Sequence, residues 1–326
     1  MGATVTMLGG GVGCSRLAVA LAAEIGPGRL TLIINTADDM WRYGLRICPD
    51  LDTNLYGLAG LRDEARGWGL ADDTFLTIDQ LRRLGHDTWF HLGDRDLATH
   101  ILRTELLKGG LALSEATSEL ARRFGIETRL LPMTDSEVGT LLTMSDSTHN
   151  FQEWFVRLGA PGPVRQVVYD GLDHAVAAPG VLDAIADADL VVVGPSNPVS
   201  SIEPILALPG VRDRVMSRRS SVVAVTPVVG SVEITEQGEA HRARARRELM
   251  GAWGLTDSPS NVAALYTDLA ATFVLDAADA SVASVIEANG QSVVLADTIV
   301  ANPGRGRRLA QTVLACTAGQ HQRTAG

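Results

Sequence analysis

The chain has few cysteines, few aromatic residues and no excess of basic residues. Its 3 cysteines among 326 residues are too few and too scattered for a disulfide framework or a zinc site. The 28 Lys and Arg residues against 38 Asp and Glu leave a net charge of −10, which argues against a nucleic-acid partner because such partners need a basic face. We expect a reducing, cytoplasmic location.

Long apolar runs are also missing. No run approaches the roughly eighteen residues of a membrane span, and the N-terminus lacks the basic segment and apolar core of a signal peptide, so we expect no membrane partner. A hydrophobic content of 46% with 20% charged residues is that of a soluble globular protein. The length allows one large or two ordinary domains.

Four aspartates follow a predicted buried strand at Leu30–Ile34. Asp38 and Asp39 come directly after this strand, and Asp50 and Asp52 follow Pro49. We expect Pro49 to keep the next residues extended, so that both carboxylates project to one side. Open α/β sheets bind ligands at the carboxyl ends of their strands.

Hard oxygen ligands at this density suit Mg²⁺, which binds one or two carboxylates together with substrate phosphates. We therefore predict Mg²⁺ as cofactor, with Asp38, Asp39 and Asp50 as candidate ligands. The alternative is that Asp38 and Asp52 cap helices, but two caps would explain only two of the four charges.

A glycine-rich loop follows the first predicted strand, at 3–8, and precedes a helix at 16–24. Gly10, Gly11 and Gly13 would let backbone N–H groups approach a phosphate at the positive end of that helix. The loop has no Lys-Ser/Thr pair and is neither a Walker loop nor a clean dinucleotide fingerprint. A tight turn without a ligand is the alternative.

A second charged segment lies at 91–100. Asp94 would cap the helix that follows, and Arg95 could hold a phosphate through two hydrogen bonds. His91 and His100 could bind a ligand hydroxyl, orient a carboxylate or simply satisfy a core contact.

A third signal follows a predicted strand at 188–193. The segment GPSNP at 194–198 predicts a rigid loop at the carboxyl end of the sheet, with Ser196 and Asn197 available to phosphate oxygens or a purine edge. A plain proline-bounded turn is the alternative.

The remaining pattern predicts an α/β fold, with a Rossmann-like, mostly parallel sheet, helices on both faces and an inserted, smaller, largely helical subdomain. We assign 1–60 and 181–318 to the nucleotide-binding core, 61–180 to the insertion and 319–326 to a tail. A strand is predicted at 151–155, with aromatic side chains that we assign to the core, as we do Trp68. The basic run at 242–247 is interpreted as a solvated helix face, or as a surface that attracts an anionic substrate.

Six motifs together resemble those of the 2-phospho-L-lactate transferases of coenzyme F420 biosynthesis. They are GGGVG at 9–13, NTADDMW at 35–41, ICPDLDT at 47–53, LGDRDLATH at 92–100, FQEW at 151–154 and GPSNP at 194–198. The resemblance covers nearly the whole chain. In bacterial members of the family the transferred group is thought to be enolpyruvyl phosphate instead of the phospholactyl group.

The resemblance implies the reaction. The deazaflavin FO attacks the phosphorus that bears the lactyl or enolpyruvyl group in a guanosine diphosphate ester (LPPG or EPPG), giving F420-0 or dehydro-F420-0 and GMP. It also implies dependence on Mg²⁺ and a homodimer. Phosphoryl transfer needs positioning and charge neutralisation more than covalent catalysis, so an acidic cation site, a glycine loop and an arginine are the expected parts.

Residue roles follow from matching positions. Asp50, Asp52 and Arg95 are the predicted catalytic residues, and Asp52 is expected to orient or deprotonate a hydroxyl of FO. Asp52 and His91 fall where the family contacts FO, although archaeal members have Lys at the position of His91; Trp41 and Asp94 complete the predicted FO site. The glycine loop with Ser196 and Asn197 is expected to hold the guanosine diphosphate. After Gly230 the chain lacks the family's Gly-Pro-Ala-Gly-Lys segment, and Arg247 or its neighbours could replace that lysine.

Two rival functions differ in class. One is a non-catalytic nucleotide-sugar-binding regulator of the gluconeogenesis-factor type, which resembles this chain in the glycine loop and the Ala-Asp-Asp turn but lacks ICPDLDT. The other is a dehydrogenase that binds a dinucleotide at the glycine loop.

Overall fold

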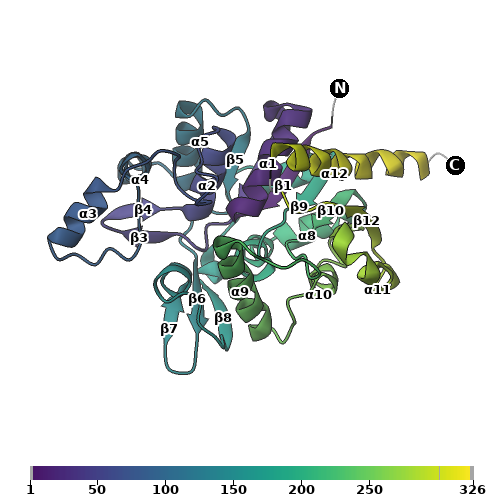
Figure 1. The fold of residues 1–326 in the computed structure, drawn as a ribbon. Coiled ribbons are helices and arrows are strands. Elements are labelled where there is room, and N and C mark those ends of the chain that lie inside the picture. Colours follow the sequence, from purple (N-terminus) through teal and green to yellow (C-terminus); the bar gives the residue numbers. More distant parts are fainter. Residues whose placement is uncertain (1–2, 301, 324–326) are drawn as a thin grey trace.

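Seven parallel strands form the central sheet of the computed structural model, which describes residues 3–300 and 302–323 (Figure 1). Their order across the sheet is β12-β11-β10-β9-β1-β2-β5. The strands are β1 (Val5–Gly9), β2 (Leu30–Ile34), β5 (Arg129–Pro132), β9 (Leu190–Val193), β10 (Val222–Val225), β11 (Thr272–Asp276) and β12 (Ser292–Ala296). The predicted Rossmann-like α/β fold is confirmed.

β9 and β10, in the middle of the sheet, are apolar along their whole length because both faces of the sheet are covered. Every residue of β9, with the sequence LVVV, and of β10, with the sequence VVAV, is buried. Continuous β-branched runs of this kind are typical of parallel strands between two helical layers, whereas a half-exposed strand would alternate. This explains why the sequence pattern predicted the strand at 188–193.

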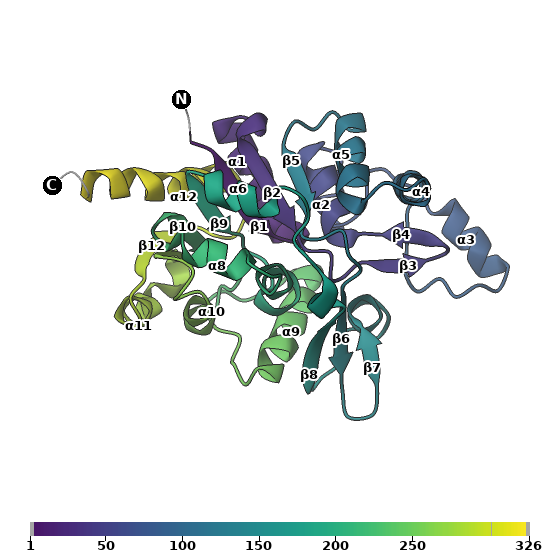
Figure 2. The same cartoon turned by 180° about the vertical axis from the view of Figure 1, so that it is seen from behind.

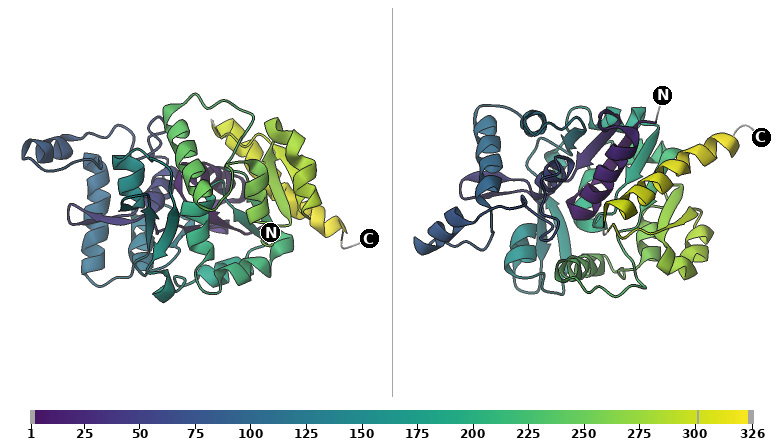
Figure 3. Two further views of the ribbon diagram at one scale, coloured as in Figure 1. Left: turned by 90° about the horizontal axis from the view of Figure 1, so that it is seen from below. Right: turned by 45° about the horizontal axis from the view of Figure 1, so that its top comes forward.

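Helices cover both faces (Figures 2 and 3). On one face lie α1 (Gly11–Ile25), α2 (Pro49–Leu58), α5 (Leu113–Arg123) and α12 (Pro303–Arg323). Figure 3 shows α1 and α12 side by side. On the other face lie α6 (Val181–Asp187), α7 (Glu203–Leu206), α8 (Val211–Met216), α9 (Gln237–Ala252), α10 (Pro259–Leu265) and α11 (Ala283–Ala288).

Two smaller parts extend from the sheet (Figure 1). One consists of the hairpin β3 (Met40–Arg42) and β4 (Leu45–Ile47) with α3 (Leu76–Arg83) and α4 (Asp94–Lys108). It has its own small core of Ile47, Ile78, Leu92 and Leu97. The other is the antiparallel sheet of β6 (Gly139–Thr143), β7 (Thr148–Asn150) and β8 (Gln166–Asp170).

These parts change the predicted boundaries. β5 lies inside the segment 61–180 that we assigned to the insertion, yet it pairs with β2 in the central sheet. The β3–β4 hairpin lies in the segment assigned to the core, yet it stands outside the sheet. The chain therefore leaves the core twice. α12 continues to Arg323, past the predicted start of the tail at 319, and residues 324–326 of that tail lie outside the described residues.

The predicted strand at 151–155 is wrong. Residues Glu153–Arg157 form a π-helical turn, and β7 ends at Asn150, whose side chain accepts a hydrogen bond from the Glu153 backbone at 2.8 Å. The alternating aromatic pattern mimicked a strand. Trp154 is fully buried as expected of a core residue.

The order of the strands reverses between β1 and β9. Chain connections leave these neighbours toward opposite faces, so a crevice opens at their carboxyl ends. The loops that follow them touch, because a Cβ atom at Gly13 would lie 2.5 Å from the carbonyl oxygen of Pro195. The glycine at position 13 is therefore needed for packing.

Gly13→Ala is expected to lower the free energy of unfolding by about 1–3 kcal/mol, because the added methyl group would push apart the two loops. Gly251→Ala in α9 is the matched control. No heavy atom lies within 4 Å of a Cβ there, so this helical substitution should raise stability by up to about 1 kcal/mol. Urea unfolding measures both, and equal stability of Gly13→Ala and the unmodified protein would contradict the proposed contact.

Candidate functional site

A cavity of about 860 Å³ lies over the carboxyl ends of the strands, at the crevice between β1 and β9. This volume suits a substrate of nucleotide size. Of the residues predicted from the sequence, the lining contains Gly10, Gly11, Gly13, Asp38, Asp50, Asp52, His91, Ser196 and Asn197. Residues of the glycine loop, the aspartate cluster, the segment at 91–100 and the GPSNP loop thus share one cleft.

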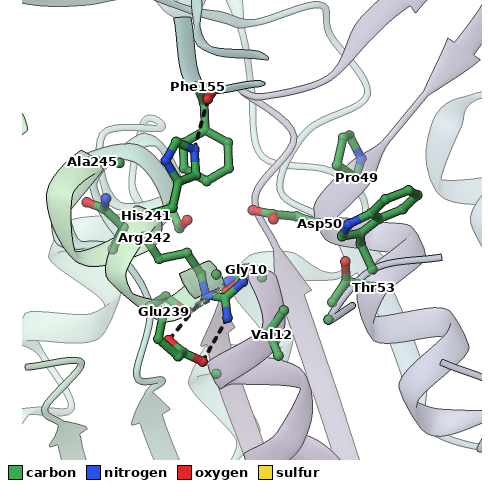
Figure 4. Close-up of a pocket in the computed structure, with 18 of the residues that line it drawn as sticks. Gly10, Val12, Pro49, Asp50, Thr53, Phe155, Glu239, His241, Arg242 and Ala245 are labelled. Carbon is green, nitrogen blue, oxygen red and sulfur yellow. Dashed lines mark hydrogen bonds and ion pairs between the residues drawn. The ribbon is translucent and has the colours of Figure 1, made fainter. Parts of the chain in front are cut away.

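Asp50 lies against the glycine loop. It belongs to the first turn of α2, and Figure 4 shows its side chain pointing into the cavity near Gly10. A Cβ atom at Gly10 would lie 1.9 Å from Asp50 Oδ2, and the Gly11 backbone donates a hydrogen bond to the Asp50 carboxylate. The positive end of α1 therefore stabilises a carboxylate of the protein itself.

Ser196 joins the glycine loop from the other side. Its hydroxyl accepts a hydrogen bond from the Gly10 N–H at 3.0 Å and donates one to the Gly10 carbonyl at 2.9 Å. The Asn197 side chain accepts hydrogen bonds from the backbones of Val199 and Ser200 and so starts the π-helical turn Pro198–Ile202. Ser196 and Asn197 thus fix the loops that form this wall of the cleft.

Asp38 and Asp50 share one hydrogen-bond donor. Asn35 Nδ2 donates to Asp38 Oδ2 at 3.2 Å and to Asp50 Oδ2 at 3.1 Å. Burial and the neighbouring Asp50 raise the pKa of Asp38 well above its usual value, although nearby Thr140 and Asn35 oppose this rise. Burial likewise raises the pKa of Asp50 to about 6, against hydrogen bonds from Asn35 and Gly11 that lower it.

This pair fits a divalent cation. Asp38 is 95% buried, and its Oδ1 has no hydrogen bond of normal length from the part of the chain that the structure describes. Two buried carboxylates side by side are costly unless a proton or a cation neutralises them. Within residues 3–300 and 302–323 no three His, Cys, Asp or Glu side chains gather as a metal site. Two carboxylates suffice for Mg²⁺ when phosphate and water supply its other ligands.

Asp39 does not join this pair. Its carboxylate lies 3.4 Å from the guanidinium of Arg46, behind the β3–β4 hairpin. Burial raises the pKa of Asp39 to about 7, and Arg46 opposes the rise. Of the three aspartates that we assigned to the cation, the structure therefore brings Asp38 and Asp50 together and places Asp39 apart from them.

Asp52 points away from Asp50, contrary to the predicted extended segment. Residues 49–58 form α2, in which positions two apart lie about 200° apart around the axis. Asp52 accepts hydrogen bonds from both terminal nitrogens of the buried Arg103, and the Nη1–Oδ2 distance is 3.0 Å. The expected cap role of Asp52 is also wrong, because α2 begins after Cys48 and Asp52 lies inside it.

A buried network continues from Asp52. His100 Nδ1 lies 3.6 Å from Asp52 Oδ2, and His100 Nε2 lies 3.3 Å from Asp96 Oδ1. Tyr56 donates a hydrogen bond of 2.6 Å to the same Asp96 oxygen. Burial alone would raise the pKa of Asp96, but the hydrogen bonds from His100 and Tyr56 lower it. A buried network of hydrogen bonds and ion pairs therefore holds Asp52 in place at the cleft.

Asp94, Arg95 and Trp41 do not line the cavity. The Asp94 carboxylate accepts hydrogen bonds from the backbones of Leu76 and Thr77, so it caps α3 and not the helix that it begins. Its pKa is lowered by hydrogen bonds from Thr74 and Thr77.

Arg95 and Trp41 are likewise engaged elsewhere. Asp73 caps α4 in return, through the backbone N–H groups of Arg95 and Asp96, and the Arg95 guanidinium donates to the Ala71 carbonyl. Trp41 is 48% exposed and donates to Glu137 at 2.8 Å. The side chains of the Gly-Asp-Arg-Asp segment and of Trp41 thus have partners within the protein.

Trp68, which the sequence analysis assigned to the core, lines the cleft instead. Trp68 is 39% exposed and borders the cavity together with Trp89, Phe90 and His91. The prediction that Trp68 packs in the core is therefore wrong. His91 is exposed, and its Nε2 lies 3.5 Å from Arg82 Nη2.

Residues of α9 also line the cleft. His241 packs on Phe155 with ring centroids 4.3 Å apart, and Arg242 lies close by, paired with Glu239 at 2.8 Å (Figure 4). Arg246 also lines the cavity, while Arg247 does not. The sequence analysis missed His241, and it named the basic run at 242–247 as a solvated face or as a surface that attracts an anionic substrate. Arg242 and Arg246 of that run border the cavity, since their spacing places them on one side of a helix.

The comparisons with known proteins agree over nearly the whole chain. The family model described as 2-phospho-L-lactate transferase CofD matches residues 5–307. The chain is 36% identical to the 2-phospho-L-lactate transferase of Methanosarcina barkeri over 94% of this chain and 96% of that protein. It is 40% identical to the phosphoenolpyruvate transferase of Thermobifida fusca over 90% of this chain and 92% of that protein.

A solved structure has a similar fold. The crystal structure of a UPF0052 family member from Bacillus halodurans matches with a TM-score of 0.60 over 96% of this chain and 99% of that chain, at 16% identity. No helix among the described residues is long and apolar enough to cross a membrane.

Asp94→Ala is expected to lower the free energy of unfolding by about 1 kcal/mol, because α3 loses its cap. If the chain binds FO as the sequence predicts, this variant should bind it as tightly as the unmodified protein, since the carboxylate lies outside the cavity. Asp73→Ala removes the reciprocal cap and serves as control. Urea unfolding and a fluorescence titration with FO measure the two effects. A large loss of FO affinity for Asp94→Ala alone would show that Asp94 contacts FO directly.

Without divalent cations, stability is expected to fall as the pH rises from about 4 to about 6. The raised pKa of Asp50 means that the folded protein retains a proton that the unfolded chain releases. The contribution of this proton to stability is complete below the pKa of Asp50 in the unfolded chain, and it is lost as the pH rises through the pKa of Asp50 in the folded protein. Thermal unfolding in EDTA at several pH values measures this loss of stability, and added Mg²⁺ should offset it. If Asp50→Asn leaves the dependence of stability on pH unchanged, the assignment of this loss to Asp50 is contradicted.

Proposed function

Because this chain belongs to the CofD family of 2-phospho-L-lactate transferases, we propose that it transfers a phospholactyl or enolpyruvyl-phosphate group from a guanosine diphosphate ester to the deazaflavin FO. The products are F420-0 or dehydro-F420-0 and GMP. In this reaction an FO hydroxyl oxygen forms a bond to the phosphorus that bears the three-carbon acid. The bond from that phosphorus to the bridging oxygen breaks, and GMP leaves with the electron pair.

One observation carries the proposal. The carboxylates of Asp38 and Asp50, the glycine loop and the Ser196–Asn197 loop all border one cavity of substrate size, and Asp52 lies on its floor. Phosphoryl transfer depends on fixed geometry and neutralised charge, and these residues come from elements that a rigid sheet holds in place. A bound Mg²⁺ would neutralise the diphosphate, with Asp38 and Asp50 as its protein ligands.

Two parts of the cleft lining suit the two substrates. Trp68, Trp89 and Phe90 offer aromatic surface to the planar deazaflavin, and His91 also borders the cavity. The α9 part offers His241, which packs on Phe155 and suits a guanine base. It also offers Arg242 and Arg246, which are paired with Glu239 and Asp257 and suit phosphates.

Asp52 orients the accepting hydroxyl in this proposal. Arg103 binds both of its carboxylate oxygens and is itself 99% buried, so the Asp52 carboxylate is held in one position. A carboxylate fixed this way accepts a hydrogen bond from the FO hydroxyl and aligns its oxygen with the phosphorus. Arg95 has no part here, because its guanidinium is bound to the Ala71 carbonyl outside the cleft.

Mass spectrometry of the product tests the reaction. The protein is incubated with FO, Mg²⁺ and either the phospholactyl or the enolpyruvyl guanosine ester, and the two products differ by two hydrogen atoms. We expect F420-0 or its dehydro form together with GMP. Binding of both substrates without product would favour a regulator, and binding of NAD without GDP would favour a dehydrogenase. Light scattering of the purified protein tests the proposed homodimer.

Asp50→Asn is expected to lower kcat by about 100- to 1000-fold, because one negative ligand of the cation is lost at the site of charge transfer. Folding should be retained, since the amide has the same shape and the carboxylate is not part of the core. Asp213→Asn, at an exposed position of α8, is the control for loss of one charge. Near-normal turnover of Asp50→Asn would remove this residue from the mechanism.

A further inference from the structure

Asn35 is a fully buried amide at the carboxyl end of β2. Its backbone N–H donates to the Gly9 carbonyl at 3.1 Å, which ties the end of β2 to the end of β1. Its side-chain oxygen accepts a hydrogen bond from the Ala37 N–H at 3.0 Å. Since a backbone N–H can only donate, this contact assigns the oxygen and turns the Asn35 Nδ2 group toward the cleft.

The Nδ2 group then meets both carboxylates. It lies 3.2 Å from Asp38 Oδ2 and 3.1 Å from Asp50 Oδ2, so each of its hydrogens can serve one carboxylate. The two acids belong to different elements, one to the turn after β2 and the other to α2. Asn35 is thus a single rigid group that connects them.

One carboxylate oxygen of this pair is left for a ligand. Asp38 Oδ1 has no hydrogen-bond partner within the described part of the chain, and its side chain borders the cavity. The other support of Asp50 is the glycine loop, where Gly10 leaves room for the carboxylate and the Gly11 backbone donates to it. Asn35 itself has no free acceptor for a cation, because Ala37 uses its oxygen.

We propose that Asn35 is a positioning residue that sets the spacing and orientation of Asp38 and Asp50 as a preformed divalent-cation site. This inference rests on the proposed function, which supplies the cation. Groups that orient the ligands of a metal commonly contribute about 10- to 100-fold to its affinity. Mg²⁺ demands near-ideal octahedral geometry and Mn²⁺ is typically bound by six oxygen ligands, whereas the larger Ca²⁺ accepts six to eight ligands in flexible geometry, so a fixed spacing also favours the smaller ions.

Binding of Mn²⁺ to the full chain tests the proposal without any turnover. Free Mn²⁺ is measured by electron paramagnetic resonance during titration, and Ca²⁺ is then added as competitor. For Asn35→Leu we expect the Kd for Mn²⁺ to rise about 10- to 100-fold. The preference for Mn²⁺ over Ca²⁺ should shrink as well, a change that loss of stability alone would not produce.

Asn54→Leu is the matched control. Asn54 is also fully buried and donates to the backbone carbonyl of Asp50 at 2.8 Å, but it does not contact the carboxylates. The same substitution there should leave the Kd and the preference near those of the unmodified protein. Asn35→Ser is a milder second variant, whose hydroxyl can serve one carboxylate at most, and it should weaken Mn²⁺ binding as well.

The outcomes separate the two proposals. If the unmodified protein binds Mn²⁺, Asp50→Asn weakens binding and both Asn35 variants bind normally, the role of Asn35 is overturned and the proposed function stands. If the unmodified protein and Asp50→Asn bind Mn²⁺ equally, the cation site itself is overturned. Equal losses for Asn35→Leu and Asn54→Leu, with unchanged preference for Mn²⁺ over Ca²⁺, would show a general packing effect and also overturn the role of Asn35.

Discussion

The structure depends on the close approach of three segments at the point where the strand order reverses: the glycine loop, the start of α2 and the loop after β9. The glycine loop after β1 touches Asp50 of α2 on one side and the loop after β9 on the other, at distances that a side chain on Gly10 or Gly13 would forbid. Glycine is required here for space more than for backbone freedom. This contact brings segments about 190 residues apart in sequence into one cleft.

The contact between these segments also places two carboxylates side by side. Asp38 and Asp50 are removed from water in the same small region, where two ionised carboxylates repel each other and lack solvation. Asn35, the Gly11 backbone and the positive end of α1 reduce the cost but leave the negative charge in place. In the proposed function this negative charge holds a cation, and the cation in turn binds the diphosphate of the guanosine ester. Asp52 differs because Arg103 already neutralises it.

Much of the fold could be predicted from the sequence because burial between two helical layers leaves a strong local signal. The strands β2, β9 and β10 appear as β-branched runs, and the motifs that follow them mark the ligand edge of the sheet. The family could also be recognised from these motifs, and the matches over nearly the whole chain confirm it. Pairing of β5 with β2 could not be predicted, since nothing local marks which strand is its neighbour.

The sequence alone determined which residue types gather at the ligand edge, because hydrophobic periodicity and glycine spacing act locally. Only the tertiary structure decided which of the charged residues work together. Asp50 and Asp52 are close in sequence, yet the helical turn sends one to Asn35 and the other to Arg103. Asp94 and Arg95 resemble site residues but serve a junction of two helices, and Trp68 reaches the cleft instead of the core. Side-chain direction depends on the backbone of the whole fold, and so spacing along the chain could not reveal it.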